Sequence, residues 1–126
     1  MLVLLDADHE LHLAVRALAQ KEDIIVPTSV LCEVDFMAST RLGADTAQTF
    51  LEDVVSGAYT SLTVDMSDMA RALELMRQYH DAHIGFVDAT LVALAERHRI
   101  RRVLTLDKRH FSIFRPKGLG YLELLP

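Results

Sequence analysis

The sequence predicts an α/β fold, with a mostly parallel sheet of four to five strands and helices on both of its faces. Short continuous apolar runs alternate along the chain with longer segments in which apolar residues recur at helical spacing. Strands of this kind are buried on both faces and are joined by crossover helices, so they pair in parallel. The length of 126 residues suits one domain, and we expect a single three-layer domain over residues 1–126.

The first elements are expected to form a strand, a helix and a second strand. The apolar run Leu2–Leu5 predicts a buried strand. From about Asp8 to Gln20, apolar residues gather on one face and predict a helix. The second strand is expected at Ile24–Val26, because Pro27 removes a backbone donor and stops it.

Two consecutive helices are expected before the next strand. The first is capped by Thr28 or Ser29 and runs to Arg41, and it is terminated by Gly43, a residue type that commonly follows a helix. The second begins at Asp45, which together with Gln48 resembles a capping box, and it ends at Gly57. This pair of helices is a departure from simple strand–helix alternation.

The second half returns to alternation. In order, we expect a strand at Ala58–Val64, a helix from Asp65 or Ser67 to about Tyr79, a loop at His80–Gly85, a helix at Phe86–His98, a strand at Arg102–Leu106 and a fifth strand at Tyr121–Leu124. In open parallel sheets the ligand crevice lies beyond the carboxyl ends of the strands. Polar residues that end a strand are therefore the first candidates for a functional site.

Four acidic residues are the candidates for such a site. Asp6 and Asp107 each end an apolar run, whereas Glu33 and Asp88 lie among apolar residues on their helices. Two negative charges about 4 Å apart repel by roughly 4 kcal/mol at an effective dielectric constant near 20. A cluster of carboxylates therefore favours a bound cation, and hard oxygen ligands favour Mg²⁺ or Mn²⁺.

The helical neighbours of Glu33 and Asp88 favour a metal site over ordinary structural roles. Neither residue has Lys or Arg three or four positions away, and Phe36 and Leu91 are among the apolar residues at those positions. We therefore expect both carboxylates to point toward the body of the protein, where an unpaired charge is costly. The alternatives are a salt bridge for Glu33 and a helix cap for Asp88.

Residues next to these acids are candidates for supporting roles. Asp8 either caps the first helix or contacts the metal ligands without binding the ion itself. Thr105, Lys108 and Arg109 lie beside Asp107 and are candidates for contacts with a substrate phosphate. The segment 97–117 holds eight Lys and Arg against Asp107 alone, although the whole chain has a net charge of −5. We interpret this basic segment as a phosphate-binding surface, with a solvated surface as the alternative.

The amino-acid composition indicates in which cellular compartment the protein acts. The single Cys32 excludes an internal disulfide and suits a reducing compartment. No apolar run reaches the length of about 18 residues that a membrane span requires. We expect a cytoplasmic protein that does not act at a membrane.

Short motifs around the four acids resemble those of a known family. The segments are Asp6-Ala-Asp8, Ser29-Val-Leu-Cys-Glu33, Gly85-Phe-Val-Asp-Ala89 and Thr105-Leu-Asp107. Their order and spacing resemble the PIN domain, and more narrowly the VapC-type toxins of toxin–antitoxin pairs, over nearly the whole chain. Asp8 departs from the family pattern, in which Ser, Thr or Asn is more frequent.

The resemblance implies a Mg²⁺- or Mn²⁺-dependent endoribonuclease that is inhibited by a cognate antitoxin and forms a homodimer. Asp6, Asp88 and Asp107 would hold the cation, and Glu33 would complete the site or orient the attacking water. The residues themselves support hydrolysis by a metal-activated water, because no Ser–His or Cys–His pair is recognisable. The RNA sequence, the cleavage position and the number of ions are not encoded in these motifs.

Two other classes of function compete with this interpretation. A receiver-type phosphoacceptor domain would use Asp6, Asp8 and Asp65, with Lys108 or Lys117 as its cation. That interpretation leaves Glu33 and Asp88 without a role. The other alternative is a catalytically silent module of the same fold that binds RNA or protein.

Overall fold

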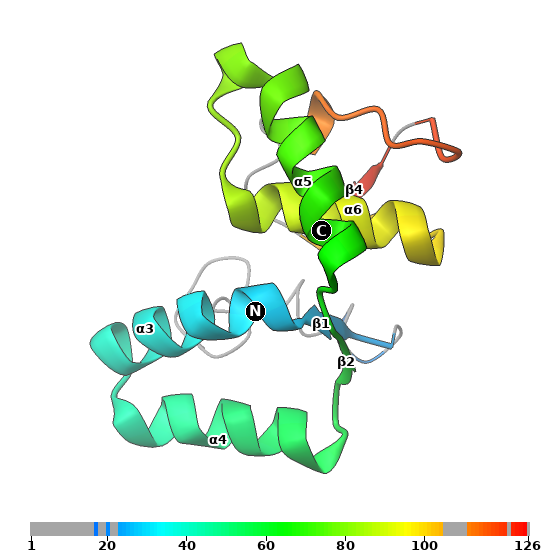
Figure 1. The fold of residues 1–126 in the computed structure, drawn as a ribbon. Helices are drawn as coiled ribbons and strands as arrows, with labels where there is room; N and C mark the ends of the chain where they lie inside the picture. Colours follow the sequence, from blue (N-terminus) through cyan, green and yellow to red (C-terminus); the bar gives the residue numbers. More distant parts are fainter. Residues whose placement is uncertain (1–16, 18–19, 21–22, 105–110, 121, 126) are drawn as a thin grey trace. The chain divides into compact units, whose positions relative to one another are not determined.

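The computed structural model describes residues 23–104, 111–120 and 122–125, together with residues 17 and 20 (Figure 1). The chain divides into two compact units, Met1–Thr63 and Val64–Pro126. The expected strand Leu2–Leu5 lies outside the described residues, as does most of the expected helix from Asp8 to Gln20.

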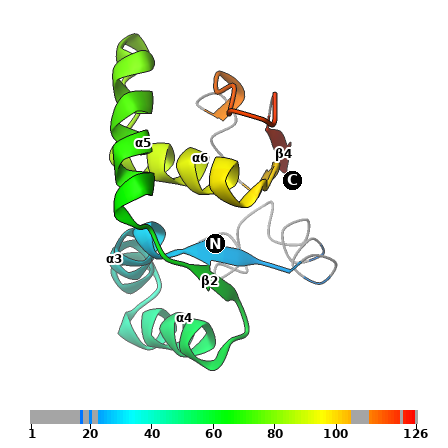
Figure 2. The ribbon, with the colours of Figure 1, turned by 45° about the vertical axis from the view of Figure 1, so that its right-hand side comes forward.

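The first unit combines two short strands with two helices. Its elements are β1 (Ile25–Pro27), the 3₁₀ turn η1 (Thr28–Val30), α3 (Leu31–Arg41), α4 (Ala44–Ser56) and β2 (Thr60–Leu62). The strands β1 and β2 pair in parallel, with Val26 opposite Ser61. Figures 1 and 2 both show α3 and α4 lying side by side as a helical hairpin.

The core of the first unit is small and lies where the hairpin meets the strands. Val26, Val34 and Phe50 are buried together there, and the Phe50 ring packs against Tyr59 with 5.8 Å between the ring centroids. Each of the three comes from a different element, so the cluster joins β1, α3 and α4. Burial of such side chains stabilises a fold by about 1.5–3 kcal/mol each.

The ends of α4 show one confirmed prediction and one that is wrong. Gly57 follows the helix with φ of 88°, a left-handed conformation that glycine adopts without steric cost, and this end was predicted. The predicted capping box of Asp45 and Gln48 is absent, because the helix starts one residue earlier, at Ala44. Asp45 therefore lies inside the first turn, where its charge favours the helix dipole without capping the chain.

The second unit contains α5 (Met66–Gln78), the 3₁₀ turn η2 (His80–Ala82), α6 (Phe86–His98), β3 (Arg102–Leu104) and β4 (Glu123–Leu125). The strands β3 and β4 pair in parallel, with Val103 opposite Leu124. Figures 1 and 2 show α5 crossing α6 steeply. Leu75, Val92 and Phe114 belong to the buried cluster of this unit, which joins both helices to the C-terminal segment.

Polar contacts attach the C-terminal segment to α6 and to the residues just after it. Arg99 donates to the carbonyl of Gly118 at 3.1 Å, and Arg101 donates to that of Leu119 at 2.8 Å. Gly118 has φ of 77°, and a Cβ there would lie 3.0 Å from the Arg99 guanidinium. Only glycine fits this approach without a shift of the arginine.

The α/β class and the parallel pairing of strands are confirmed. The helix at Phe86–His98 has the predicted bounds, and the strands in the second unit match the predicted positions to within a few residues. In the part of the chain that the structure describes, four strands form two separate parallel pairs. That residues 1–126 form one three-layer domain remains a prediction.

Candidate active site

Two of the four predicted acids lie among the described residues. Glu33 lies on α3 of the first unit and Asp88 on α6 of the second. Asp6 and Asp107 lie outside the described residues. The convergence of the four carboxylates therefore remains a prediction.

Asp88 is held by a rigid local frame. It is the third residue of α6, and Gly85 precedes the helix in an extended conformation. Its neighbour Ala89 is fully buried, and Val92 one turn later is 1% exposed. Asp88 itself is half-buried. A carboxylate in this position lies near the partial positive charge of the helix N-terminus, which favours its ionised form.

Glu33 differs from the expectation that it points toward the body of the protein. Its side chain is exposed, and Phe36, expected beside it on a buried face, is 70% exposed. The buried face of α3 is formed by Val34 and Ala38 instead. The small Ala38 permits close packing of α3 against its neighbour, so the helix turns its alanine rather than its phenylalanine inward. An exposed glutamate can still reach a solvent-filled site.

The donor set fits a hard divalent ion. Both described acids offer carboxylate oxygens, the ligand type that Mg²⁺ and Mn²⁺ prefer. Among the described residues, no group of three or more His, Cys, Asp or Glu side chains is placed to hold a metal. That Asp6 and Asp107 complete the site with these two acids remains a prediction.

The residues predicted to support the site, Asp8, Thr105, Lys108 and Arg109, all lie outside the described residues. Their roles remain predictions.

The described arginines of the segment 97–117 contact acceptors of the protein itself, and the interpretation of the segment as a phosphate-binding surface remains a prediction. Arg97 pairs with the buried Asp68, and Arg102 lies 3.7 Å from Glu123. Arg99 and Arg101 bind backbone carbonyls of the C-terminal segment, as described above. Arg115 donates to the carbonyls of Ser112 and Phe114. Three of these side chains, those of Arg99, Arg101 and Arg102, bind the C-terminal segment.

Asp65, the phosphoacceptor of the receiver-type alternative, caps α5. Its Oδ1 accepts hydrogen bonds from the Ser67 hydroxyl at 2.6 Å and from the Asp68 amide at 3.0 Å. These donors lower the pKa of Asp65 to about 2. The carboxylate is thus engaged in holding the helix start, which disfavours the phosphoacceptor role.

One further group of polar residues was not predicted as a site. Arg77, His80 and His83 line a hollow of about 410 Å³ together with Met76 and Ile84. We call this feature the cationic hollow. The spacing of three residues between its basic side chains is the only signal of it in the sequence, and that signal is weak because it runs through the end of a helix.

The described helices include none that is long and apolar enough to cross a membrane. The expectation of a cytoplasmic location remains a prediction.

Comparison with known proteins places the chain in a family. A model of the PIN domain matches residues 1–115. Ribonuclease VapC26 of Mycobacterium tuberculosis (strain ATCC 25618 / H37Rv) is 36% identical over 103 residues, which cover 82% of this chain and 76% of that protein. The crystal structure of M. tuberculosis VapC20, a toxin that cleaves the sarcin–ricin loop, superposes with a TM-score of 0.79 at 21% identity, covering 98% of this chain and 92% of that one. The likeness to VapC20 shows the fold. Because the family match extends over nearly the whole sequence, the chain belongs to the PIN-domain family.

Proposed function

We propose that this protein is a Mg²⁺- or Mn²⁺-dependent endoribonuclease toxin of the VapC type. The observation that carries the proposal is its 36% identity with a ribonuclease over 103 residues, together with a PIN-domain match over residues 1–115 that includes all four predicted acids. The likeness to VapC20, a toxin that cleaves the sarcin–ricin loop, supports the fold in which these acids would act.

In this proposal Asp6, Asp88 and Asp107 hold the ion, and Glu33 completes the site or orients the attacking water. A divalent ion, when bound, supplies a water of lowered pKa and neutralises charge on the phosphate. The protein contributes by holding Asp88 at the start of a helix whose following residues are buried, so that this carboxylate keeps one position. Glu33 remains open to solvent, as a residue that handles water requires.

The proposed partners are RNA as substrate, a cognate antitoxin as inhibitor and a second copy of the chain in a homodimer. These follow from the VapC-type relationship. Co-expression with a neighbouring antitoxin gene should restore growth to cells that expression of this chain alone arrests.

The decisive experiment is RNA cleavage by the purified protein with added Mg²⁺ or Mn²⁺. Cleavage should stop with EDTA and return when the ion is restored in excess. Asp88→Asn should abolish cleavage, whereas Asp45→Asn, which alters a first-turn aspartate on α4, should retain it. Cleavage that survives EDTA would overturn the metal-dependent mechanism. A protein that binds RNA but never cleaves it would favour the catalytically silent alternative.

A further inference from the structure

The side chains of the cationic hollow are exposed, as are the described arginines of segment 97–117, but the two sets differ in their partners. Arg77, His80 and His83 are all exposed. Within the described residues the side chains of Arg77, His80 and His83 make no hydrogen bond or ion pair, whereas Arg97, Arg99 and Arg101 are bound to acceptors of the protein itself. Three side chains that can donate hydrogen bonds therefore line the cationic hollow, and none of them has a partner among the described residues.

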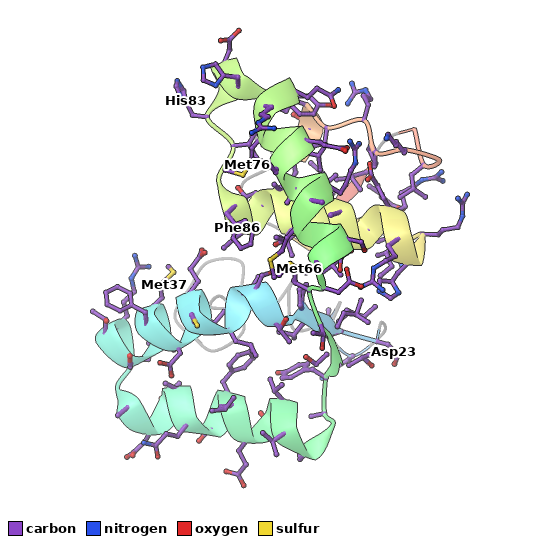
Figure 3. All side chains as sticks on the ribbon, in the orientation of Figure 1. Asp23, Met37, Met66, Met76, His83 and Phe86 are labelled. Atoms are coloured by element: carbon purple, nitrogen blue, oxygen red, sulfur yellow. The ribbon has the colours of Figure 1, made fainter. Side chains whose placement is uncertain are left out.

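The hollow is continuous with the element that carries Asp88. Ile84, in its wall, lies four residues before Asp88, so their Cα atoms are at most about 14 Å apart. Figure 3 shows Met76 and His83 on the same side of the second unit, with Phe86 at the start of α6 following them. A ligand in the hollow would thus lie close to Asp88, one of the proposed metal ligands.

The chemistry of the hollow selects an anion with several oxygen acceptors. Arg77 offers a planar fork of donors that matches a phosphate, and each imidazole donates from one nitrogen when neutral and from both when protonated. Asp81, which is exposed on η2, is the nearest acidic residue in sequence and lies outside the hollow's lining. Zinc is disfavoured as the occupant, because within the described residues no third ligand joins the two histidines.

Simpler explanations account for only part of this arrangement. Arg77 lies in the last turn of α5, where a positive charge favours the helix dipole. That explanation applies equally to Arg41 at the end of α3, which does not line the hollow. It does not account for the two histidines that face the same space.

We propose that the cationic hollow binds a backbone phosphate of the RNA substrate, a few nucleotides from the phosphate that is cleaved. Arg77 is the principal phosphate-binding residue, and His80 and His83 donate to the same group. Phe86, which is 48% exposed at the first position of α6, offers a ring on which an unstacked base can lie. This exposed aromatic residue favours a polynucleotide over a free anion. The inference rests on the proposed function for the identity of the substrate.

The test is binding of a single-stranded RNA oligonucleotide to the full-length protein in EDTA, measured over a series of salt concentrations. Arg77→Gln should weaken binding about tenfold, as expected for loss of a charge-assisted hydrogen bond. It should also reduce the slope of log K against log salt by about 0.7, because one phosphate contact of a single strand is lost. The matched control is Arg41→Gln, which should change neither quantity.

A second variant tests the two histidines of the hollow without changing Arg77. The double substitution of His80 and His83 by Gln should weaken RNA binding while the unfolding midpoint stays that of the wild type, since both side chains are exposed. In the wild type, the imidazole NMR signals of these histidines should shift on addition of the oligonucleotide. An equal shift with the same concentration of inorganic phosphate would show a site for free anions and overturn the proposal.

The outcomes separate this inference from the proposed function. Cleavage with normal RNA affinity in both variants overturns the hollow as a subsite and leaves the nuclease assignment intact. Binding that depends on Arg77, in a protein that never cleaves RNA with Mg²⁺ or Mn²⁺, supports the subsite and overturns the nuclease. If the variants bind RNA normally but bind the antitoxin more weakly, the hollow is a protein-docking site and the proposal is wrong.

Discussion

Arg97 and Asp68 form a two-point ion pair that joins α6 to α5. Arg97 Nε donates to Asp68 Oδ1 at 2.8 Å, and Nη2 donates to Oδ2 at 2.7 Å. Asp68 is 2% exposed, and its Oδ2 also accepts a hydrogen bond from the Asp65 amide at 3.0 Å. A single carboxylate thus completes the capping box of α5 and fixes α5 against the helix that carries Asp88.

The first prediction concerns this ion pair. Asp68→Ala should lower the free energy of unfolding by about 3 kcal/mol, because it removes a buried carboxylate that satisfies both Arg97 and the helix start. The measurement is urea denaturation. Asp81→Ala, which removes an exposed aspartate of the same unit, should leave the midpoint nearly unchanged. Equal stability of the two variants would show that the pair contributes nothing.

The second prediction compares two partners of one arginine. Arg71 donates to Glu96 Oε1 at 2.7 Å and to Glu74 Oε2 at 3.0 Å. Glu96 is the more buried of the two acids, and its Oε2 also accepts from the Lys117 amide at 2.7 Å. Burial alone would raise the pKa of Glu96, but these hydrogen bonds outweigh it and lower the pKa.

Glu96→Gln should therefore destabilise the fold by about 1–3 kcal/mol and speed amide exchange at Lys117. Glu74→Gln should cost less than about 0.5 kcal/mol, because that pair is exposed to solvent. Unfolding by denaturant and hydrogen exchange measure the two effects. Slow exchange at Lys117 in the Glu96 variant would contradict the role of Glu96 as an anchor of the C-terminal segment.

The third prediction concerns acid unfolding. The hydroxyl of Ser67 and the amide of Asp68 lower the pKa of Asp65 from 3.8 to about 2. A depressed carboxyl pKa stabilises the folded state above pH 3.8, and this contribution is lost as the pH falls toward 2. Ser67→Ala removes the largest cause and should move this loss to higher pH. Titration of unfolding by circular dichroism would detect the change, and identical curves would refute it.

The fourth prediction tests the metal site without measuring cleavage. Mn²⁺ at ten times its dissociation constant should stabilise the wild-type protein by about 1.4 kcal/mol, seen as a rise in Tm. Asp6→Asn, Asp88→Asn and Asp107→Asn should each lose this rise, because each removes a proposed ligand. Asp45→Asn should keep it. A full Mn²⁺ response in all three ligand variants would place the ion elsewhere.

The bounds of α6 could be predicted from the sequence, whereas the ion pair of Asp68 with Arg97 could not. The bounds Phe86–His98 follow from a glycine before the helix and an apolar run inside it, both of which are local properties. The partner of Asp68 is 29 residues away on α6, and no spacing rule reveals it. The same limit applies to Arg99 and Arg101, which bind the carbonyls of Gly118 and Leu119 that only the fold brings near.

The orientation of Glu33 illustrates the same limit within one helix. Its helical neighbours are apolar, and counting them predicted a buried face. The packing of α3 against α4 and β1 instead selected Val34 and Ala38, leaving Phe36 exposed. Helical spacing gives the residues that share a face, but it does not give which face meets a neighbour.

The sequence alone determined the α/β class, the parallel strands, most element boundaries in the described part of the chain to within a few residues, and the motifs that mark the PIN-domain family. These depend on short-range spacing, on glycine and proline, and on residue types that persist in order along the chain. The tertiary structure decided which charges are partnered: it assigned Asp68 and Glu96 to arginines, turned Glu33 outward and left Arg77, His80 and His83 open around a hollow. The physical reason is that the stability of a charge depends on its solvent exposure and its partners, and both are set by contacts between residues distant in sequence.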